Sequence, residues 1–482
     1  MRKAWPLLLK LLLLLVLLTF AAAGAAAWYL QQQGVTPRAL APYAERRSLG
    51  HNPTIEATGR FLSRTLLWLD RGEAGLPGAL PAGLGAQPGA TPAPPGRVVL
   101  VGSSEEAHQA FAAALPGDVI TFLPGTYRFA PRAPAALRPG SEGRSVTVRA
   151  ITPGSVVIEM NAVEGFLVQA PFWTFENLVI RGVCGDHPSC EHAFHVVGKA
   201  HSFAAVNNTI TDFNAHFKIN GDGAAFPDRG RIEANTLSNA SVRRTSNPVT
   251  PIDIVAASGW KIQRNLITDF IKGEGDRISY GAFAKGGGGN NVFSHNAVLC
   301  EHKLGRQPGQ RVGLSLGGGG TGKDYCRDRR CITEQDGSEL SGNLVASCSD
   351  AGVYLNGAAA SVLLHNSVID TAGVQLRYLV TSARVEGNLI DGAISTRDGA
   401  VLREADNLAA PIAYSYAGYH RLRNMFADSA AFDFSWDGAA PRRAVRAASK
   451  DDLCGSARAQ APAYGAFEDF QACLRPRKAG PG

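Results

Sequence analysis

The sequence predicts an all-β solenoid, a parallel β-helix in which short strands stack coil upon coil, and three observations support this fold. An apolar residue, two further residues, Asn and a short apolar run recur along most of the chain. Pro-Gly turns bracket short alternating strands, in a chain with 54 Gly and 27 Pro among 482 residues. Charged residues make up only 18% of the chain, which argues against a long exposed helical array.

The spacing of the Asn repeat defines the coil. The shortest intervals are 22 and 23 residues, close to the length of about 22 that one coil needs, so the longer intervals indicate loop insertions. We expect each Asn to take the left-handed conformation at a sharp bend, with stacked Asn side chains hydrogen-bonded along the solenoid. Propeller blades and helical repeats need other periods, and neither is present. The repeated positions are Asn177, Asn208, Asn235, Asn265, Asn296, Asn343, Asn366 and Asn388.

The N-terminal segment, residues 1–30, indicates export. Arg2, Lys3 and Lys10 precede Leu11–Leu30, a run of uncharged residues long enough to span a bilayer. The run fits a signal anchor or a cleaved signal peptide, and in both cases the chain beyond residue 31 is exported. We expect an inner-membrane anchor facing the periplasm, or a secreted or periplasmic protein if the segment is cleaved.

Residues 31–71 form a membrane-proximal helical segment. Ile55, Leu62, Leu66 and Leu69 recur at helical spacing, and this face could lie against the membrane or dock on the body of the protein. Residues 72–96 are rich in Pro and Gly and predict a linker or stalk.

The predicted body begins at residue 97. A strand at 98–101 is followed by Ser103 and Glu106, which form a capping box for a short helix over 104–114. Alternating residues at 119–123 then lie between two Pro-Gly turns. This opening resembles that of right-handed parallel β-helix proteins, whose first coil is covered by an amphipathic helix.

The end of the chain resembles the same class. Residues 462–470, PAYGAFEDF, are similar to the terminal segment of these proteins, although the usual Asp is missing. The predicted β-helix domain therefore spans 97–470, and residues 471–482 form a C-terminal tail.

Eight cysteines in an exported chain favour disulfides, and without a CxxC pair there is no zinc-site pattern. One connectivity consistent with the spacing is Cys184–Cys190, Cys326–Cys331, Cys454–Cys473 and Cys300–Cys348.

A polar stripe is predicted on one face of the solenoid. The strands that follow the Asn turns, including 281–285, 313–317, 352–356 and 373–377, alternate inward apolar and outward polar residues. A solvated face is the simplest explanation, but the clustering of cations between two long loops also fits a binding face. The outward stripe contains Lys218, Asp253, Lys285, Tyr354, Asn356, Arg377 and Arg397.

A groove lined by Lys, Arg, Tyr and Asn suits an acidic polysaccharide. β-Elimination of a uronic acid needs a cation or metal to neutralise the carboxylate, a base to remove the adjacent proton, and an acid for the leaving oxygen. A lysine crowded by other cations has a lowered pKa and can be the base. Lys285 lies in the same predicted stripe as Lys218, Arg377 and Arg397, so we expect its pKa to be lowered.

Residues 281–320 resemble the chondroitinase B-type and alginate lyases of the β-helix class. The resemblance implies that Lys285 is the base and Arg311 the partnering arginine, with Tyr354 a third candidate catalytic residue. In that family His-Gly follows the arginine, whereas Val312-Gly313 follows here. Glu274 and Asp276 are the nearest equivalents of the family's calcium ligands. The stripe residues Lys218, Asp253, Asn356, Arg377 and Arg397 would bind substrate.

Two other functions stay open. A glycoside hydrolase would use two carboxylates, and Asp350 and Asp370 lie one coil apart, although turn chemistry also explains both. A membrane-tethered β-helix could instead bind or guide a polysaccharide without cleaving it.

Nucleotides and nucleic acids are not expected partners. Gly317–Lys323 approaches the phosphate-binding loop pattern, but Asp324 replaces the hydroxyl residue that binds magnesium. The net charge of +7 is mild for this length. His216, His295 and His365 are expected to be structural.

Overall fold

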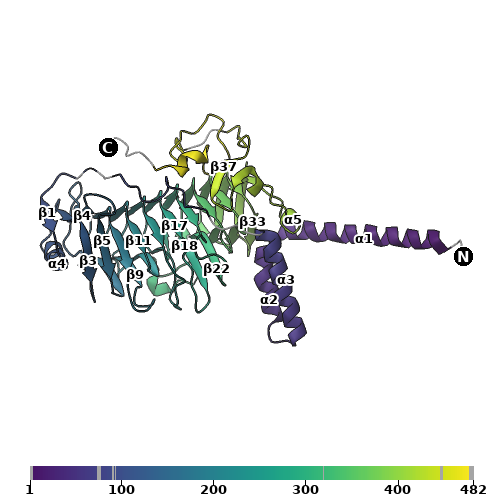
Figure 1. Cartoon of the computed structure of the whole chain (residues 1–482), viewed down its shortest axis with the longest axis horizontal. Coiled ribbons are helices and arrows are strands. Elements are labelled where there is room, and N and C mark those ends of the chain that lie inside the picture. The colour runs from purple at the N-terminus through teal and green to yellow at the C-terminus, as the bar shows by residue number, and fades with distance from the viewer. Residues whose placement is uncertain are drawn as a thin grey trace.

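The structure, a computed structural model, describes residues 4–72, 78–89, 92, 94–318, 320–445 and 449–476, with side chains from residue 9 onward. It confirms the parallel β-helix. Three parallel sheets of 12, 11 and 9 strands run the length of the body, and neighbours in each sheet come from successive coils (Figure 1).

The strands of each sheet follow one another in chain order. The first sheet contains β1 (Val98–Val101), β2 (Val119–Phe122), β4 (Val146–Ala150), β7 (Trp173–Glu176), β10 (Ala204–Val206), β13 (Arg231–Glu233), β16 (Lys261–Gln263), β20 (Val292–Ser294), β24 (Glu339–Ser341), β28 (Ser361–Leu364), β31 (Ser382–Glu386) and β34 (Val401–Ala405). The second contains β3 (Gly125–Phe129), β5 (Val156–Met160), β8 (Val179–Gly182), β11 (Thr209–Thr211), β14 (Thr236–Ser238), β17 (Leu266–Thr268), β21 (Ala297–Leu299), β25 (Leu344–Ala346), β29 (Ser367–Ile369), β32 (Leu389–Ile390) and β35 (Leu408–Ala409). The third contains β6 (Glu164–Val168), β9 (His192–Val197), β12 (Ala215–Asn220), β15 (Ile252–Val255), β18 (Ile278–Lys285), β22 (Gln310–Leu316), β26 (Val353–Asn356), β30 (Gly373–Arg377) and β33 (Ala393–Arg397). A short parallel sheet joins β19 (Gly288–Gly289), β23 (Gln335–Asp336) and β27 (Ala358–Ala359), and an antiparallel pair joins β36 (Phe426–Asp428) and β37 (Asp433–Trp436).

The core of the β-helix is filled by inward side chains that stack between coils. Phe194 lies on Phe217 of the next coil, with ring centroids 5.2 Å apart and planes at 9°. The first coil is closed by helix α4 (Ser104–Ala112), whose Phe111 is buried and stacks on Phe166. Ser103 Oγ accepts the Glu106 N–H, which confirms the predicted cap.

An asparagine ladder joins the coils between the first and second sheets. Each Nδ2 donates to the Oδ1 of the next Asn at 2.9 to 3.0 Å. Each rung satisfies buried backbone groups as well; Asn235 Nδ2, for example, also donates to Ala205 O. The ladder consists of Asn208, Asn235, Asn265, Asn296, Asn343, Asn366, Asn388 and Asn407, the last of which lies outside the predicted repeat.

The predicted conformation of these asparagines was wrong. The left-handed residue at the bend is the one before the ladder Asn, for example Ala234 with φ 54° and His295 with φ 55°. Asn177 is left-handed itself, and it pairs with Asn207, the residue before the ladder position. The ladder Asn therefore recurs because its amide bridges coils, and the bend falls on its neighbour.

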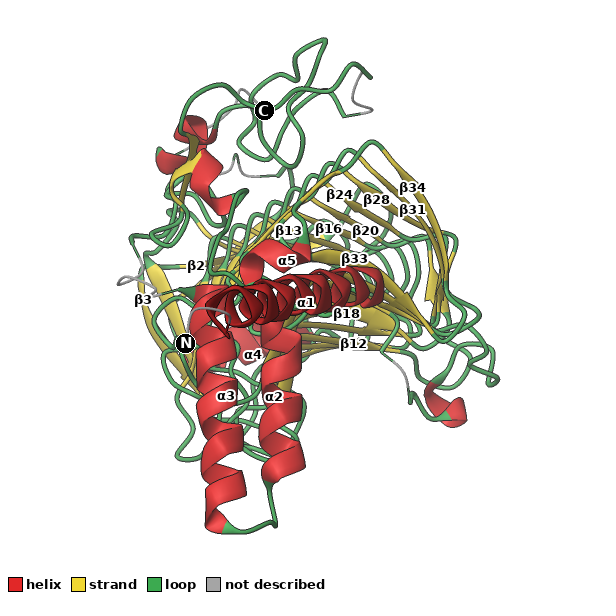
Figure 2. Cartoon of the chain, turned by 90° about the vertical axis from the view of Figure 1, so that its right-hand side faces the viewer, coloured by secondary structure: helices red, strands yellow, loops and turns green. Residues whose placement is uncertain are grey.

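The N-terminal helices lie at the C-terminal end of the β-helix (Figure 1). Helix α1 (Ala4–Gln33) extends away from the body, and Leu9–Gln33 is long and apolar enough to cross a membrane, as a signal sequence also would be. Helices α2 (Pro37–Ser48) and α3 (Pro53–Arg71) lie side by side across that end, and a short helix, α5 (Ile412–Ser415), contacts α1 (Figure 2).

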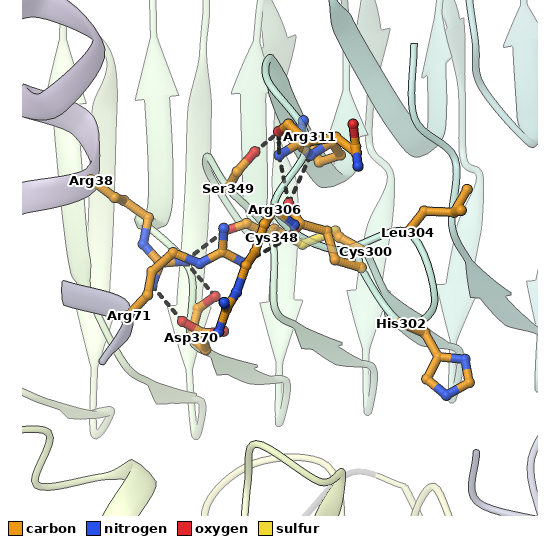
Figure 3. A network of polar contacts seen from close by, with 12 residues as sticks. Arg38, Arg71, Cys300, His302, Leu304, Arg306, Arg311, Cys348, Ser349 and Asp370 are labelled. Carbon is orange, nitrogen blue, oxygen red and sulfur yellow. Dashed lines mark hydrogen bonds and ion pairs between the residues drawn. A yellow bond between two sulfur atoms is a disulfide. The ribbon is translucent and has the colours of Figure 1, made fainter. Parts of the chain in front are cut away.

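The α2–α3 hairpin is docked on the body through a buried ionic network. The Arg38 guanidinium, which is 1% exposed, pairs with Asp70 of α3 and with Asp370, and donates to Cys348 O at 2.6 Å (Figure 3). Arg423 pairs with Asp370 and Asp391 beside it. The apolar residues of α3 do not all contribute to docking, because Ile55 and Leu62 are 44% and 46% exposed.

The described part of the predicted linker is packed along the body rather than free. Leu84 is buried in a core cluster, Gly83 N donates to Cys473 O, and Gln87 exchanges two hydrogen bonds with Asn207. The same cluster holds Phe467, Phe470 and Cys473, so the 3₁₀ helix η3 (Phe470–Leu474) belongs to the body and the tail begins after it.

All four predicted disulfides are present and confirm the proposed connectivity. They are Cys184–Cys190, Cys300–Cys348, Cys326–Cys331 and Cys454–Cys473.

Candidate functional site

The outward stripe lies on the third sheet in the predicted register. Lys218 on β12 is opposite Asp253 on β15, and Lys218 Nζ lies 2.7 Å from Asp253 Oδ2. Asn356, Arg377 and Arg397 occupy equivalent positions on three successive strands. The alternation of inward and outward residues thus places these side chains on one face because parallel strands stack without slippage.

The lysine cavity, a hollow of about 520 Å³, lies where β12, β15 and β18 end. Its floor contains Lys218, Asn220 and Lys285, and its far wall is the loop between residues 320 and 329. The loop residues that line it are Gly320, Thr321, Gly322, Asp324, Tyr325, Cys326 and Arg329.

Lys285 is a half-buried cation without an ion-pair partner in the described part of the chain. Its Nζ lies 4.6 Å from the centre of the Phe283 ring. Burial lowers the pKa of Lys285 from its ordinary value of 10.5, and Lys218 lowers it further while Asp253 and Glu334 oppose the shift. A larger fraction of Lys285 is therefore neutral near pH 7 than of an exposed lysine.

A buried glutamate holds the loop over Lys285. Glu334 accepts hydrogen bonds from Gly286 N at 2.8 Å and from Thr321 Oγ1 at 2.8 Å, so it ties the end of β18 to the cavity wall. Gly318 packs on the lysine itself, since a Cβ there would lie 2.8 Å from Lys285 Cδ. The sequence offered no repeat or motif that could have identified Glu334.

A second hollow, the helix-walled cavity of about 970 Å³, continues from the first, and Gly320 lines both. Its floor contains Tyr354, Asn356, Arg377 and Arg397, and α2 forms a wall through residues that include Tyr43 and Arg46. Burial raises the pKa of Tyr354, and Arg377 opposes this shift. Arg377 itself pairs with Asp398 at 2.6 Å.

Positive charge dominates the combined surface of the two cavities. The cationic lining residues are Lys218, Lys285, Arg329, Arg46, Arg377 and Arg397, and the acidic ones are Asp324, Glu334 and Asp350. Glu334 is occupied by the loop that it holds, and Lys218 and Arg377 are paired with Asp253 and Asp398, so the net positive charge rests on Lys285, Arg329, Arg46 and Arg397. A continuous, net cationic hollow attracts a polyanion.

Arg311 is not brought together with Lys285. It lies opposite Ser279, six residues before Lys285 on the neighbouring strand, which corresponds to about 20 Å along the strand. It is 2% exposed and pairs with Glu301 at 2.6 Å, and Glu301 also pairs with Arg71 of α3. Figure 3 shows Arg311 and Arg71 among the polar contacts that surround the Cys300–Cys348 disulfide.

The two proposed calcium ligands also lie apart from the lysine cavity. Asp276 pairs with Lys272 at 2.7 Å, and Glu274 is exposed in the same loop. Neither residue lines either cavity.

The two aspartates of the hydrolase hypothesis have different surroundings. Asp350 lines the helix-walled cavity, accepts a hydrogen bond from Gln310 Nε2 at 3.0 Å, and has a pKa that burial raises. Asp370 pairs with Arg38 and Arg423 outside that cavity, and these arginines hold its pKa well below the usual range against the effect of burial. The structure therefore does not aim the two carboxylates at a common space.

The segment that approaches a phosphate-binding loop forms a wall of the lysine cavity. Its Lys323 begins a single 3₁₀ turn, η1 (Lys323–Tyr325), instead of a helix. The three histidines expected to be structural contact Ser238 O, Asp451 O and Arg443, for His216, His295 and His365 in turn.

A cluster at the first strands of the third sheet was not predicted from the sequence. Glu164, His192 and His195 place ligating atoms within 4.8 Å of one another, and among the residues that the structure describes this is the group suited to a metal ion. Burial lowers the pKa of His192 to about 3, with contributions from His195 and Lys218. Histidines on separate positions of one short strand, HAFHVV, were the available signal.

No family model matches the chain, and the search of curated proteins finds no match. Among solved structures it is similar to a pectate lyase, with 14% sequence identity over 75% of this chain and 90% of that chain and a TM-score of 0.43. It is also similar to a family 6 alginate lyase, with 14% identity over 65% of this chain and 51% of that chain and a TM-score of 0.34. A third is the A-module of the Azotobacter vinelandii mannuronan C-5 epimerase, with 13% identity over 64% and 92% and a TM-score of 0.39.

These similarities are to the parallel β-helix fold, which the strand order establishes by itself. The chain spans about half the length of the alginate lyase. The predicted parallel β-helix is confirmed by the strand order, and the similarities assign no reaction to this chain.

Proposed function

We propose that this protein binds an acidic polysaccharide along the two connected cavities and cleaves it by β-elimination with Lys285 as the base. The observation that carries the proposal is the environment of Lys285. It is half-buried, lacks a carboxylate partner among the described residues, has a lowered pKa, and lies in a hollow lined by other cations. A base for a weakly acidic C–H and a carboxylate-binding surface are thereby combined in one place.

The reaction divides among residues of the third sheet and of the loop wall. Arg329 of the loop wall would neutralise a uronate carboxylate, which makes the adjacent C–H more acidic, and Lys218, held by Asp253, would donate a hydrogen bond to it. The proton passes to Lys285 Nζ, the electron pair forms the carbon–carbon double bond, and the glycosidic C–O bond breaks. We propose that Tyr354 donates a proton to the leaving oxygen.

The remaining stripe residues extend the binding surface. Asn356, Arg377 and Arg397 are spaced at successive rungs of about 4.8 Å, so they offer repeated contacts to a linear polyanion. Asp253 holds Lys218 in place. Arg311 lies too far from Lys285 to act with it, and we propose that it supports the fold through Glu301.

The location of the reaction follows from α1. We propose that α1 exports the chain, either as a membrane tether or as a signal sequence, so that the cavities meet a polysaccharide outside the cytoplasm.

A binding scaffold without catalysis is the main alternative, because the same cationic surface would hold a polyanion. A paired-carboxylate hydrolase is less favoured, since Asp370 is committed to Arg38 and Arg423.

The deciding experiment incubates the full chain, in detergent, with a panel of uronic-acid polysaccharides with and without calcium. β-Elimination gives the ultraviolet absorbance of an unsaturated product, and we expect Lys285→Ala to abolish it while Lys261→Ala, on an exposed position of the first sheet, retains it. Binding without this absorbance in the wild-type chain would instead favour the scaffold. New reducing ends without absorbance would favour a hydrolase.

A further inference from the structure

The Glu164–His192–His195 cluster lies on β6 and β9, two strands of the third sheet that no residue of the proposed reaction uses. Glu164 is opposite His192 on the neighbouring strand, and His195 lies three residues further along β9, opposite Leu167. The two imidazole rings have centroids 5.3 Å apart. Two neighbouring coils thus bring two imidazoles and a carboxylate to one point.

The hydrogen bonds of His195 fix the position of its lone pair. Asn220 Nδ2 donates to Gly221 O at 3.0 Å, so Asn220 Oδ1 faces His195 Nε2 at 2.9 Å and requires a donor there. In the neutral ring, Nδ1 then carries the lone pair. That atom lies 2.9 Å from Glu164 Oε1, which is also an acceptor. Two acceptors at this distance need a cation between or beside them, either an extra proton or a metal ion.

His192 adds a second unused lone pair. Its Nδ1 is buried and has no hydrogen-bond partner, and its side chain is 14% exposed. Its Nε2 lies 3.8 Å from Glu191 Oε1, so a further carboxylate borders the cluster. The nearest lysine, Lys218, is already paired with Asp253. The cluster therefore carries excess negative charge and unsatisfied nitrogen.

We propose that Glu164, His192 and His195 bind a divalent transition-metal ion of the zinc type. Two histidines and one glutamate are a donor set that zinc uses, and imidazole nitrogen selects such metals over calcium. Ligand atoms about 2 Å from one ion are at most about 4 Å apart, so the 4.8 Å separation closes with small side-chain rotations. Asn220 is then the outer partner that fixes the His195 tautomer.

The site is adjacent to the lysine cavity but separate from Lys285. Asn220 lines that cavity and contacts His195, so the ion would lie one coil beyond Lys218 at the end of the hollow. Metal binding does not depend on the proposed elimination and can be measured without any substrate.

The test uses the full chain in detergent, dialysed against a chelator and titrated with Co²⁺ as a visible probe and with Zn²⁺ by calorimetry. We expect one equivalent to bind, with tetrahedral cobalt bands that Zn²⁺ displaces. His192→Gln and His195→Gln should each weaken binding more than about 100-fold, since even outer-shell partners contribute about 10–100-fold. Asn220→Ala should weaken it about 10-fold.

His201→Gln is the matched control, because His201 lies on the adjoining turn and contacts Ser202. It should bind Zn²⁺ as the wild type does. Zn²⁺ should also raise the Tm of the wild-type chain and leave that of His195→Gln unchanged, which separates metal loss from misfolding. Absence of cobalt bands and of a Zn²⁺ isotherm in the wild type would overturn the proposal and assign the Glu164–His195 contact to an extra proton. Equal loss in His201→Gln would overturn it too.

Discussion

Lys218 and Asp253 face each other on adjacent strands of the third sheet, with Lys218 Nζ 2.7 Å from Asp253 Oδ2. On the next strand, Phe283 lies opposite Asp253, and its ring contacts the Lys285 ammonium group. Asp253 Oδ1 has no hydrogen-bond partner. Lys218 therefore occupies one oxygen of the buried aspartate, and the pKa of Lys285, which Asp253 raises, is also lowered by this residue one coil further away.

The first prediction concerns this coupling. Lys218→Ala removes a neighbouring positive charge and frees Asp253, so the pKa of Lys285 should rise. Less neutral amine is then present near pH 7, and the acidic limb of the pH–rate profile should move to higher pH. Initial rates of product formation across pH measure the shift, with Lys261→Ala as control. A limb that moves to lower pH would contradict the assignment.

Lys285 should also limit the stability of the protein. Its pKa in the folded state is lowered by burial below 10.5, so between the two pKa values the unfolded chain binds more protons and stability rises with pH. Below that window the charged amine costs stability. Lys285→Met should therefore raise the Tm at pH 7 by roughly 1–3 °C, with a smaller gain near pH 10. Thermal unfolding at both pH values tests this, and a lower Tm at pH 7 would refute it.

Arg38 should control the docking of the α2–α3 hairpin. Arg38→Ala leaves Asp70 buried without its partner and Asp370 paired with Arg423 alone, which costs about 3–5 kcal/mol. We expect the hairpin to become sensitive to limited proteolysis while the Tm of the β-helix changes little. Arg60→Ala removes an exposed pair with Glu56, worth about 0–1 kcal/mol, and should leave the cleavage pattern unchanged.

Substitutions of Asn235, a ladder residue, and of Ala234, the residue before it, should change the stability of the protein in opposite directions. Asn235→Ala removes a bridge and leaves the buried Asn208 N–H and Ala205 carbonyl without their side-chain partner, at about 1–3 kcal/mol for each. Ala234→Gly relieves a left-handed residue, a gain of about 1 kcal/mol that the flexibility of glycine partly offsets. Chemical denaturation of both variants measures the contrast. Equal destabilisation would mean that the bend does not strain Ala234.

Most of the fold could be predicted because its signals are local and repeated. The Asn repeat and the alternation of strands predicted the coils and the register of Lys218, Asp253, Asn356, Arg377 and Arg397, and the spacing of the cysteines gave the disulfide connectivity as one possibility. The left-handed residue could not be assigned, because Asn is common both at bends and in ladders, and only the backbone separates the two roles.

The cavities and the role of Arg311 depend on contacts that no local pattern carries. The family resemblance made Arg311 a partner of Lys285, but the side chain is buried and pairs with Glu301, the residue after the disulfide-bonded Cys300. The wall of the helix-walled cavity comes from α2, more than 200 residues before the strands that it covers. Glu334 acts through a loop closure that only the folded chain reveals.

The docking of helix α2 on the last coils means that the hairpin, although synthesised first, reaches its final position late in folding. Arg38 contacts Cys348 and Asp370 across sequence separations of 310 and 332 residues. A ribosome produces the hairpin first, but its binding surface exists only after almost every coil has formed. The Arg38 network can therefore form only when the solenoid is nearly complete. A chain that stalls or misfolds midway leaves the hairpin, including Asp70, exposed to quality-control proteases.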